Sequence, residues 1–202
     1  MHALRSAERF ASLQRELIPL ATIDPLTGLC NRHGFFEQAT QVRARTGPDR
    51  KLSAILLDID NFKHINASYG HEAGDEAIRA CAEAARFDEA VAGDEFALLL
   101  ERPLPESLEI AKGLRRRLAS RPVKTRKGPI TLTWSIGVGE AQPQDSVDQI
   151  LARADAALYN AKTQGRNCVA SAPSGLRMKE TVAQHGIARA KACSEDLVRI
   201  AW

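Results

Sequence analysis

Two adjacent acidic residues, Asp94 and Glu95, are the side chains in this sequence that are best placed for chemistry. They follow the small pair Ala92-Gly93 and precede an apolar run at residues 96–100. Glycine accepts the backbone angles of a tight reversal, and an apolar run after a turn is typical of a buried strand. The pattern predicts two carboxylates at a hairpin tip. Gly-Asp is also common in solvated turns, and this stretch alone favours that simpler interpretation.

A third acidic residue ends a second apolar run. Residues 52–58 form a compact apolar segment bounded by charges, which predicts a buried strand that ends in Asp58. In an antiparallel sheet this strand and the hairpin can be neighbours, so Asp58 can meet Asp94 and Glu95 at one edge. Carboxylates from two backbone segments suit Mg²⁺, which takes one or two of them together with substrate phosphates. Two such ions would hold the attacking and leaving oxygens of a phosphoryl transfer.

Two basic residues near the end of the last predicted helix of the domain, Lys162 and Arg166, would complement a triphosphate. Each of these features also has a purely structural interpretation. A strand-end Asp often caps the next turn, and basic residues at the C-terminal end of a helix interact with its dipole. The joint pattern of acids and bases favours a nucleotide site.

Local signals indicate the elements that must position these residues. Residues 24–32 contain Pro and Gly and predict an ordered loop, and residues 61–74 are polar and glycine-containing. Ser146 and Gln149 predict a capping box at the start of a helix that Gly165 ends. Helices are predicted at residues 35–44, 75–86, 105–120 and 147–163, and strands at residues 52–58, 96–100, 130–138 and 167–171.

The order of these elements predicts an α+β fold with a mainly antiparallel central sheet flanked by helices. The domain is expected at residues 22–170. Residues 1–21 are expected to form an N-terminal helix for dimerisation or linkage, and residues 171–202 a C-terminal helical extension. The heptad-like apolar spacing within residues 1–21 is equally compatible with packing on the same domain and with a short coiled-coil seam for a second subunit.

Composition excludes several classes of protein. The 28 basic and 25 acidic residues give a net charge of +3, which is too balanced to indicate nucleic-acid or membrane binding. No apolar segment could span a bilayer, and charges among the first 20 residues exclude a signal peptide. The four cysteines match no metal or disulfide spacing, which is typical of reduced thiols. We expect a cytoplasmic protein that binds neither nucleic acid nor membranes.

Six short motifs follow one another across residues 22–170. They are DPLTGLCNR from residue 24, LDIDNFKHIN from residue 57, YGHEAGD from residue 69, AGDEF from residue 92, SIGV from residue 135, and RADAALYNAK with GRN from residue 153. Together they resemble the GGDEF family, which has the diguanylate cyclase fold. Any one motif alone would be weak, whereas six in order are specific.

The resemblance implies a fold similar to the palm of polymerases and class III nucleotidyl cyclases, with a ferredoxin-like core. It implies that two GTP molecules are joined into cyclic di-GMP with release of two pyrophosphates. Each domain would hold one GTP, so catalysis would require a homodimer. The implied cofactor is Mg²⁺ or Mn²⁺, the implied role is bacterial signalling, and control could come from a separate sensory protein.

The resemblance also assigns roles to individual residues. Asp58, the Ile59 carbonyl and Asp94 would bind metal. Glu95 would hold the second metal or assist deprotonation of the attacking 3′-hydroxyl. Asp94 and Glu95 are thus the expected catalytic pair, and which of them is the general base stays open.

Nucleotide recognition is assigned in the same way. Asn66 and Asp75 match the positions that hydrogen-bond guanine, since an amide and a carboxylate can together recognise its acceptor and its N–H donors. His71 either lines the same pocket or caps a helix. The expected phosphate contacts are the backbone at Phe62 and Lys63 and the side chains of Lys162 and Arg166.

The sequence departs from the family pattern just before the acidic pair. The first signature glycine is Ala92, which predicts reduced rather than abolished activity; a positive φ there would cost about 1 kcal/mol or more. The segment between Asp75 and Ala92 is shorter than usual by roughly two helical turns, so the helix or the first hairpin strand must be cut back. The Arg-x-x-Asp inhibitory product site is missing, which predicts no high-affinity product inhibition there.

These departures motivate two alternatives to an active diguanylate cyclase. The first is a degenerate domain that binds GTP as a regulatory module without turnover. The second is a structural dimerisation domain without nucleotide affinity, against which the intact guanine and phosphate positions argue.

Overall fold

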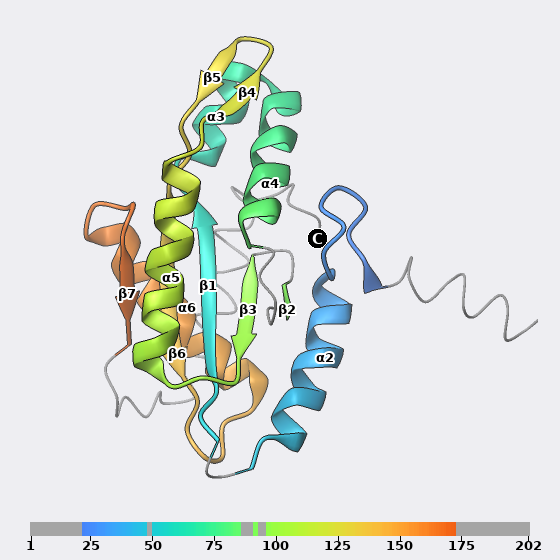
Figure 1. Cartoon of the computed structure of the whole chain (residues 1–202), viewed down its shortest axis with the longest axis vertical. Helices are drawn as coiled ribbons and strands as arrows, with labels where there is room; N and C mark the ends of the chain where they lie inside the picture. Colours follow the sequence, from blue (N-terminus) through green and yellow to red (C-terminus); the bar gives the residue numbers. More distant parts are fainter. Residues whose placement is uncertain (1–21, 48–49, 86–90, 93–95, 173–202) are drawn as a thin grey trace, which may run out of the picture.

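The structure, a computed structural model, describes residues 22–47, 50–85, 91–92 and 96–172 (Figure 1). The helices predicted within residues 1–21 and 171–202 lie outside these residues, as do the two acids Asp94 and Glu95. The proposed segment boundaries therefore stay predictions.

Within the described residues, one sheet has the strand order β2-β3-β1-β6-β7. Its central strand β1 (Ser53–Ile59) is antiparallel to both β3 (Ala97–Leu100) and β6 (Trp134–Glu140). At one edge β2 (Val91–Ala92) pairs antiparallel with β3, and at the other β7 (Val169–Ser171) runs parallel to β6. The predicted α+β class and mainly antiparallel sheet are confirmed, with β7 as the parallel exception.

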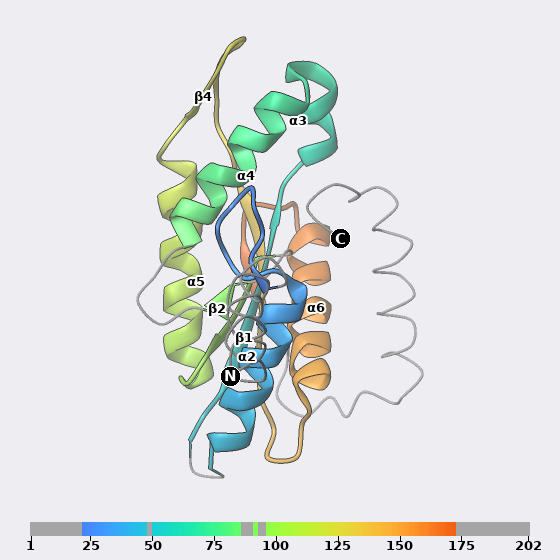
Figure 2. The ribbon, with the colours of Figure 1, turned by 90° about the vertical axis from the view of Figure 1, so that its right-hand side faces the viewer.

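Helices cover both faces of this sheet (Figure 2). On one face lie α4 (His71–Ala85) and α5 (Leu104–Ala119), and on the other lie α2 (Arg32–Arg45) and α6 (Val147–Thr163). No helix in the described part of the chain is long and apolar enough to cross a membrane.

The strand β1 contributes to both hydrophobic layers because successive side chains of a strand point to opposite faces. Ile55 and Leu57 pack in the layer beneath α4 and α5, whereas Ala54 and Leu56 pack in the layer beneath α2 and α6. All of these residues are buried, so β1 is covered on both sides up to the point where Asp58 follows. This burial fixes the strand end that carries the predicted metal ligand.

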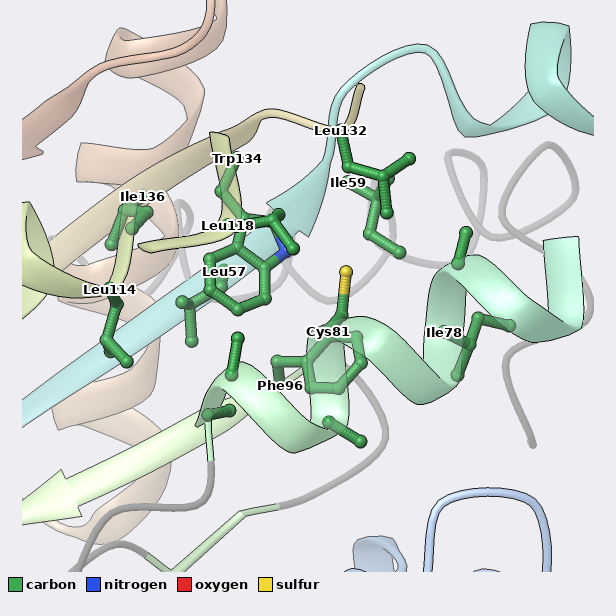
Figure 3. Packing of buried hydrophobic residues seen from close by; sticks show 14 of the residues in the cluster. Leu57, Ile59, Ile78, Cys81, Phe96, Leu114, Leu118, Leu132, Trp134 and Ile136 are labelled. Carbon is green, nitrogen blue, oxygen red and sulfur yellow. The ribbon is translucent and has the colours of Figure 1, made fainter. Parts of the chain in front are cut away.

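The first of these layers contains a cluster of buried side chains around Trp134 (Figure 3). The ring of Phe96 lies 6.0 Å from the ring of Trp134, centroid to centroid, and both residues are buried. Cys81 of α4 belongs to the same cluster. The residue that directly follows Glu95 is therefore anchored in the core, as the predicted buried strand after the acidic pair requires.

The segment predicted only as polar and glycine-containing folds into helix. It contains α3 (Phe62–Tyr69) and the first turn of α4, separated by Gly70 with a φ of 92°. Gly74 does not break α4. A Cβ at this position would lie 2.0 Å from Oδ1 of Asn66, so the absence of a side chain allows α3 and α4 to pack closely.

The strand predicted at residues 130–138 is divided in two. Its first residue belongs to a hairpin of β4 (Val123–Thr125) and β5 (Gly128–Ile130), and β6 begins only at Trp134. The turn between β4 and β5 leads into Gly128, whose φ of 112° suits glycine. This hairpin extends beyond the sheet beside α3 and α4 (Figure 1).

Candidate active site

Asp58 lies next to the C-terminal end of β1 and forms an ion pair with the last turn of α6. Its Oδ2 atom is 3.0 Å from Nζ of Lys162, and the two side chains are 16% and 28% exposed. The helix α6 packs against β1 and β6, so the position of the lysine is set by the sheet itself. The structure thus brings together two residues that the sequence predicts to share a site.

The surroundings of the Asp58 carboxyl favour a nearby positive charge. Burial raises the pKa of the Asp58 carboxyl, Lys162 opposes the rise, nearby Asp60 adds to it and Arg166 opposes it weakly. Asp155 of α6 behaves similarly: burial raises its pKa, Lys162 lowers it and the charge of Asp58 raises it again. Two partly buried carboxyls therefore share the field of one lysine. A divalent cation fits such a donor set.

Asp155 was not predicted as a site residue, although it belongs to the motif that contains Lys162. It stands seven residues before the lysine. Seven residues are close to two helical turns, so the two side chains share one face of α6. That spacing is a sequence signal that could have identified Asp155.

Asp60 directly follows β1, and its side chain is buried. It was also not predicted as a site residue. It accepts hydrogen bonds from the hydroxyls of Thr133 and Ser135, at 2.7 and 2.6 Å, and from the backbone N–H of Asn167, at 3.0 Å. These bonds connect the end of β1 to the start of β6 and to the turn after α6. Arg166, the second predicted triphosphate contact, lies in that turn and is exposed.

The structure places both predicted guanine contacts at the junction of α3 and α4. Asn66 lies near the end of α3, with its Oδ1 against the backbone of Gly74. Asp75 is the next residue of α4. His71 is the first residue of that helix, one turn before Asp75, and is exposed. The three residues thus come from one helix junction, while their roles stay predictions.

Phe62 and Lys63, the predicted phosphate-binding backbone, form the first two residues of α3. The preceding Asn61 has a φ of 57° and makes no side-chain cap to the helix. The backbone N–H groups of a first helical turn point out of the helix, where they can meet an anion. This turn begins just beyond Ile59, the last residue of β1 and the predicted carbonyl ligand.

The acidic pair itself lies outside the described residues, but both flanks of it are defined. Ala92 on β2 pairs with Leu98 on β3. The carbonyl of Phe96 accepts a hydrogen bond of 3.2 Å from the N–H of Leu57, the residue before Asp58. Phe96, which directly follows the acidic pair, is therefore hydrogen-bonded to the residue that directly precedes Asp58. Residues 86–90, between α4 and β2, lie outside the described residues, so which of the two elements is cut back stays a prediction.

Comparison with known proteins agrees with this geometry. The family described as "Diguanylate cyclase, GGDEF domain" matches residues 21–168. The diguanylate cyclase DgcM of Escherichia coli K12 is 38% identical over 171 residues, which cover 79% of this chain and 40% of DgcM. The response regulator PleD of Caulobacter vibrioides is 36% identical over 165 residues, which cover 75% of this chain and 36% of PleD. The matched part covers 25% of the length of MucR from Pseudomonas aeruginosa and 51% of a diguanylate cyclase from Vibrio cholerae.

Solved structures give the same result for the fold. The coiled coil and GGDEF domain of DgcB from Caulobacter crescentus, in complex with c-di-GMP, aligns with a TM-score of 0.76 and 29% identity, covering 84% of this chain and 95% of that one. The diguanylate cyclase SiaD from Pseudomonas aeruginosa, in complex with its activator SiaC, aligns with a TM-score of 0.67 and 29% identity, covering 83% and 70%. The predicted palm-like fold is confirmed, and this chain belongs to the GGDEF domain family.

Proposed function

We propose that this chain is a diguanylate cyclase, which condenses two GTP molecules into cyclic di-GMP and two pyrophosphates. The observation that supports this most directly is the partly buried pair of Asp58 and Lys162 at the end of the central strand. A carboxylate for a cation and a lysine for phosphate lie 3.0 Å apart there. Membership of the family and the names of the relatives point to the same reaction.

The residues that would hold the cation are Asp58, the carbonyl of Ile59, and the acids Asp94 and Glu95. Bound Mg²⁺ or Mn²⁺ would neutralise phosphate charge and favour ionisation of the attacking hydroxyl. Lys162 would then exchange its contact with Asp58 for a phosphate oxygen of the nucleotide. Asp58 would lose the positive charge of Lys162 in this exchange, and the bound metal ion would replace that charge.

The nucleotide would lie between the helix junction and the end of α6. The amide of Asn66 and the carboxylate of Asp75 would bind the guanine edge, with His71 at the rim. The backbone at Phe62 and Lys63 would bind phosphates from one side. Lys162 and Arg166 would bind them from the other.

The reaction itself transfers a nucleotidyl group. The 3′-hydroxyl oxygen of one GTP attacks the α-phosphorus of the other, and its proton passes to Asp94 or Glu95. The bond from that phosphorus to the bridging oxygen breaks, and pyrophosphate leaves with the electron pair. A second, reciprocal transfer closes the ring. Because each domain binds one GTP, two copies of this chain must face each other.

The decisive experiment incubates the purified protein with GTP and Mg²⁺ and measures cyclic di-GMP by chromatography. We expect product that increases more than linearly with protein concentration, because dimers form the catalyst. Asp58→Asn should abolish product without lowering the thermal midpoint, because burial raises the pKa of the Asp58 carboxyl and disfavours its ionised form in the fold. Absence of product at concentrations where sedimentation shows dimers would refute the proposal.

A degenerate domain that binds GTP without turnover is the second candidate. The observations that favour it are Ala92 in place of the first signature glycine and the short segment between Asp75 and Ala92. This candidate predicts GTP binding by calorimetry and no cyclic di-GMP in the same sample. Restoring the signature with Ala92→Gly should then produce turnover.

Control by a separate protein is a further part of the proposal. SiaD, which resembles this chain, was solved in complex with its activator SiaC. We expect this chain likewise to respond to a partner that changes its dimerisation. GTP is a cytoplasmic substrate, so the proposed reaction belongs in the cytoplasm.

A further inference from the structure

The turn that follows α6 has an unusual backbone. Gly165, Arg166 and Asn167 have φ angles of 110°, 65° and 46°. Residues other than glycine rarely adopt positive φ, so two of them in succession persist only when neighbouring groups hold them there. The N–H of Arg166 donates to the carbonyl of Ala161, in the last turn of α6, at 3.1 Å. Asn167 is held by Asp60 and Arg115, which lie elsewhere in the fold.

Asp60 holds the turn from the side of the sheet. Its side chain is buried, and its Oδ2 accepts from both the hydroxyl of Thr133 and the N–H of Asn167. Its Oδ1 accepts from Ser135, and its own N–H donates to the carbonyl of Thr133 at 2.9 Å. A buried carboxylate with this many donors is fixed in position. Because Asp60 follows β1 directly, the turn is tied to the strand end that carries Asp58.

Arg115 holds the turn from the opposite side. It extends from α5, which covers the other face of the sheet from α6. Its Nη1 donates to Oδ1 of Asn167 at 2.8 Å and to the carbonyl of Asn167 at 3.2 Å. The N–H, the carbonyl and the side-chain oxygen of Asn167 are therefore all hydrogen-bonded.

We propose that Asp60, Arg115 and Asn167 form a clamp that positions Arg166 for the triphosphate. The proposal rests on the proposed function, since it takes the ligand of Arg166 to be the phosphates of GTP. Arg166 directly precedes the clamped residue Asn167, so the hydrogen bonds that hold Asn167 also fix the backbone from which the Arg166 side chain extends. Asp60 and Arg115 do not touch substrate in this arrangement. They are positioning residues, and the clamp couples α5 to the phosphate end of the site.

The test compares two neighbouring arginines of α5. Arg115→Met keeps the aliphatic stem and removes the donors to Asn167. Arg116→Met is the matched control, because it removes the same charge from an exposed position about 100° around the helix. Each protein is titrated by calorimetry with a non-hydrolysable GTP analogue and with GMP, both in the presence of Mg²⁺. Amide hydrogen exchange is measured at Asn167.

We expect Arg115→Met to weaken binding of the GTP analogue about 3- to 10-fold, since it removes charge-assisted hydrogen bonds at a partly exposed site. Binding of GMP, which lacks the terminal phosphates, should be unchanged. Exchange at the Asn167 amide should be faster. Arg116→Met should match the wild type in all three measurements. Arg115→Lys, which keeps one donor, should restore part of the affinity for the analogue.

Several outcomes would overturn the clamp. Equal losses for the GTP analogue and GMP would show a general disturbance and overturn the clamp, as would identical behaviour of Arg115→Met and Arg116→Met. If the wild type binds no GTP analogue, the proposed function fails, and with it the assignment of Arg166 to phosphate. Exchange at Asn167 then still decides whether Arg115 holds the turn: faster exchange supports the clamp, and unchanged exchange overturns it.

Asp60→Ala provides an independent test from the other side of the turn. Alanine removes both carboxylate oxygens, so the N–H of Asn167 loses its acceptor. Relative to the wild type, we expect faster exchange at the Asn167 amide and a larger loss of affinity for the GTP analogue than for GMP. Circular dichroism establishes that the variant is folded. A folded variant with unchanged exchange at Asn167 would overturn the role of Asp60.

Discussion

Gly137 offers a sharp test of how the sheet positions the candidate site. This residue lies in β6, paired with Leu56 on one side and Ala170 on the other. A Cβ added here would lie 2.1 Å from the carbonyl oxygen of Ala154 and 2.2 Å from the backbone nitrogen of Leu158, both on α6. The helix that carries Lys162 therefore packs directly on the backbone of β6.

The expected effect of Gly137→Ala follows from these distances. The new methyl group would be about 1 Å too close to backbone atoms that no side-chain rotation can move, so α6 must shift away from the sheet. Overpacking a core costs about 1–3 kcal/mol, and a helix backbone as the obstacle places the cost at about 3 kcal/mol. For a domain of this size that lowers the thermal midpoint by about 6–12 °C. The same shift would misplace Lys162.

Thermal unfolding followed by circular dichroism measures the first effect, at one fixed protein concentration because the proposed dimerisation would also stabilise the fold. Calorimetry with a non-hydrolysable GTP analogue measures the second, for which we expect a loss of about 10-fold or more. Gly113→Ala is the control: it lies in α5 with nothing within 4 Å of the added Cβ. Alanine is the better helix former, so this variant should gain about 0.5–1 kcal/mol.

A Gly137→Ala protein that melts within about 2 °C of the wild type and binds the GTP analogue equally well would contradict the expected shift of α6. That result would mean that α6 can move away from β6 at little cost without disturbing the end of β1. A lower thermal midpoint with unchanged affinity for the GTP analogue would separate the two effects. It would reject only the inference that a shift of α6 displaces Lys162.

Three further predictions concern charged groups. Lys162→Met should weaken binding of the GTP analogue about tenfold yet change the thermal midpoint little, because a partly exposed ion pair contributes about 0–1 kcal/mol; a large loss of stability would contradict this. Asp155→Asn should raise the midpoint at pH 7, since burial raises the pKa of Asp155 and its ionised form is disfavoured in the folded state. In metal-free buffer this advantage should shrink as the pH falls through the folded pKa and vanish below the ordinary value of 3.8, where the wild-type carboxyl is also neutral; a constant difference would reject the argument. Asp145→Ala should cost about 3 kcal/mol in urea unfolding, because it leaves Arg153, 9% exposed and 2.6 Å from Asp145, without its carboxylate; a change below about 1 kcal/mol would show that water replaces the partner.

Elements with strong local signals could be predicted from the sequence. The capping box of Ser146 and Gln149 forms as predicted, and Gly165 ends α6 with a φ of 110°. In both cases the information lies within one helical turn. The strand ending near Asp58 was equally accessible, because a short apolar run between charges has few alternatives.

The polar segment between Asn61 and Gly74 shows where local signals fail. The sequence indicated only that this segment is polar and glycine-containing, whereas it forms α3 and the first turn of α4, and Gly74 makes room for Asn66 of α3. Only the tertiary contact reveals that role. The hairpin of β4 and β5 was missed for a similar reason, since its strands are short and its contacts are distant. Lys127 of its turn donates to the carbonyl of Ser68, and Arg126 pairs with Glu72.

The site shows the same division. Asp58 was predicted as a metal ligand and Lys162 as a phosphate contact of one nucleotide site, and the structure places the two side chains 3.0 Å apart. Asp60 was passed over because its donors, Thr133, Ser135 and Asn167, are distant in sequence and meet it only in the folded chain. Its importance depends on burial, which the sequence pattern around it does not show.

The indole of Trp134 gives this protein an internal optical reporter. It is fully buried, and its ring lies 6.0 Å from Phe96, the residue that directly follows the acidic pair. A rearrangement of the signature that displaces the ring of Phe96 would change the surroundings of the indole and shift the fluorescence emission of Trp134. The sequence contains one other tryptophan, Trp202. A Trp202→Phe protein would therefore report nucleotide binding through the fluorescence of the core, without any attached dye.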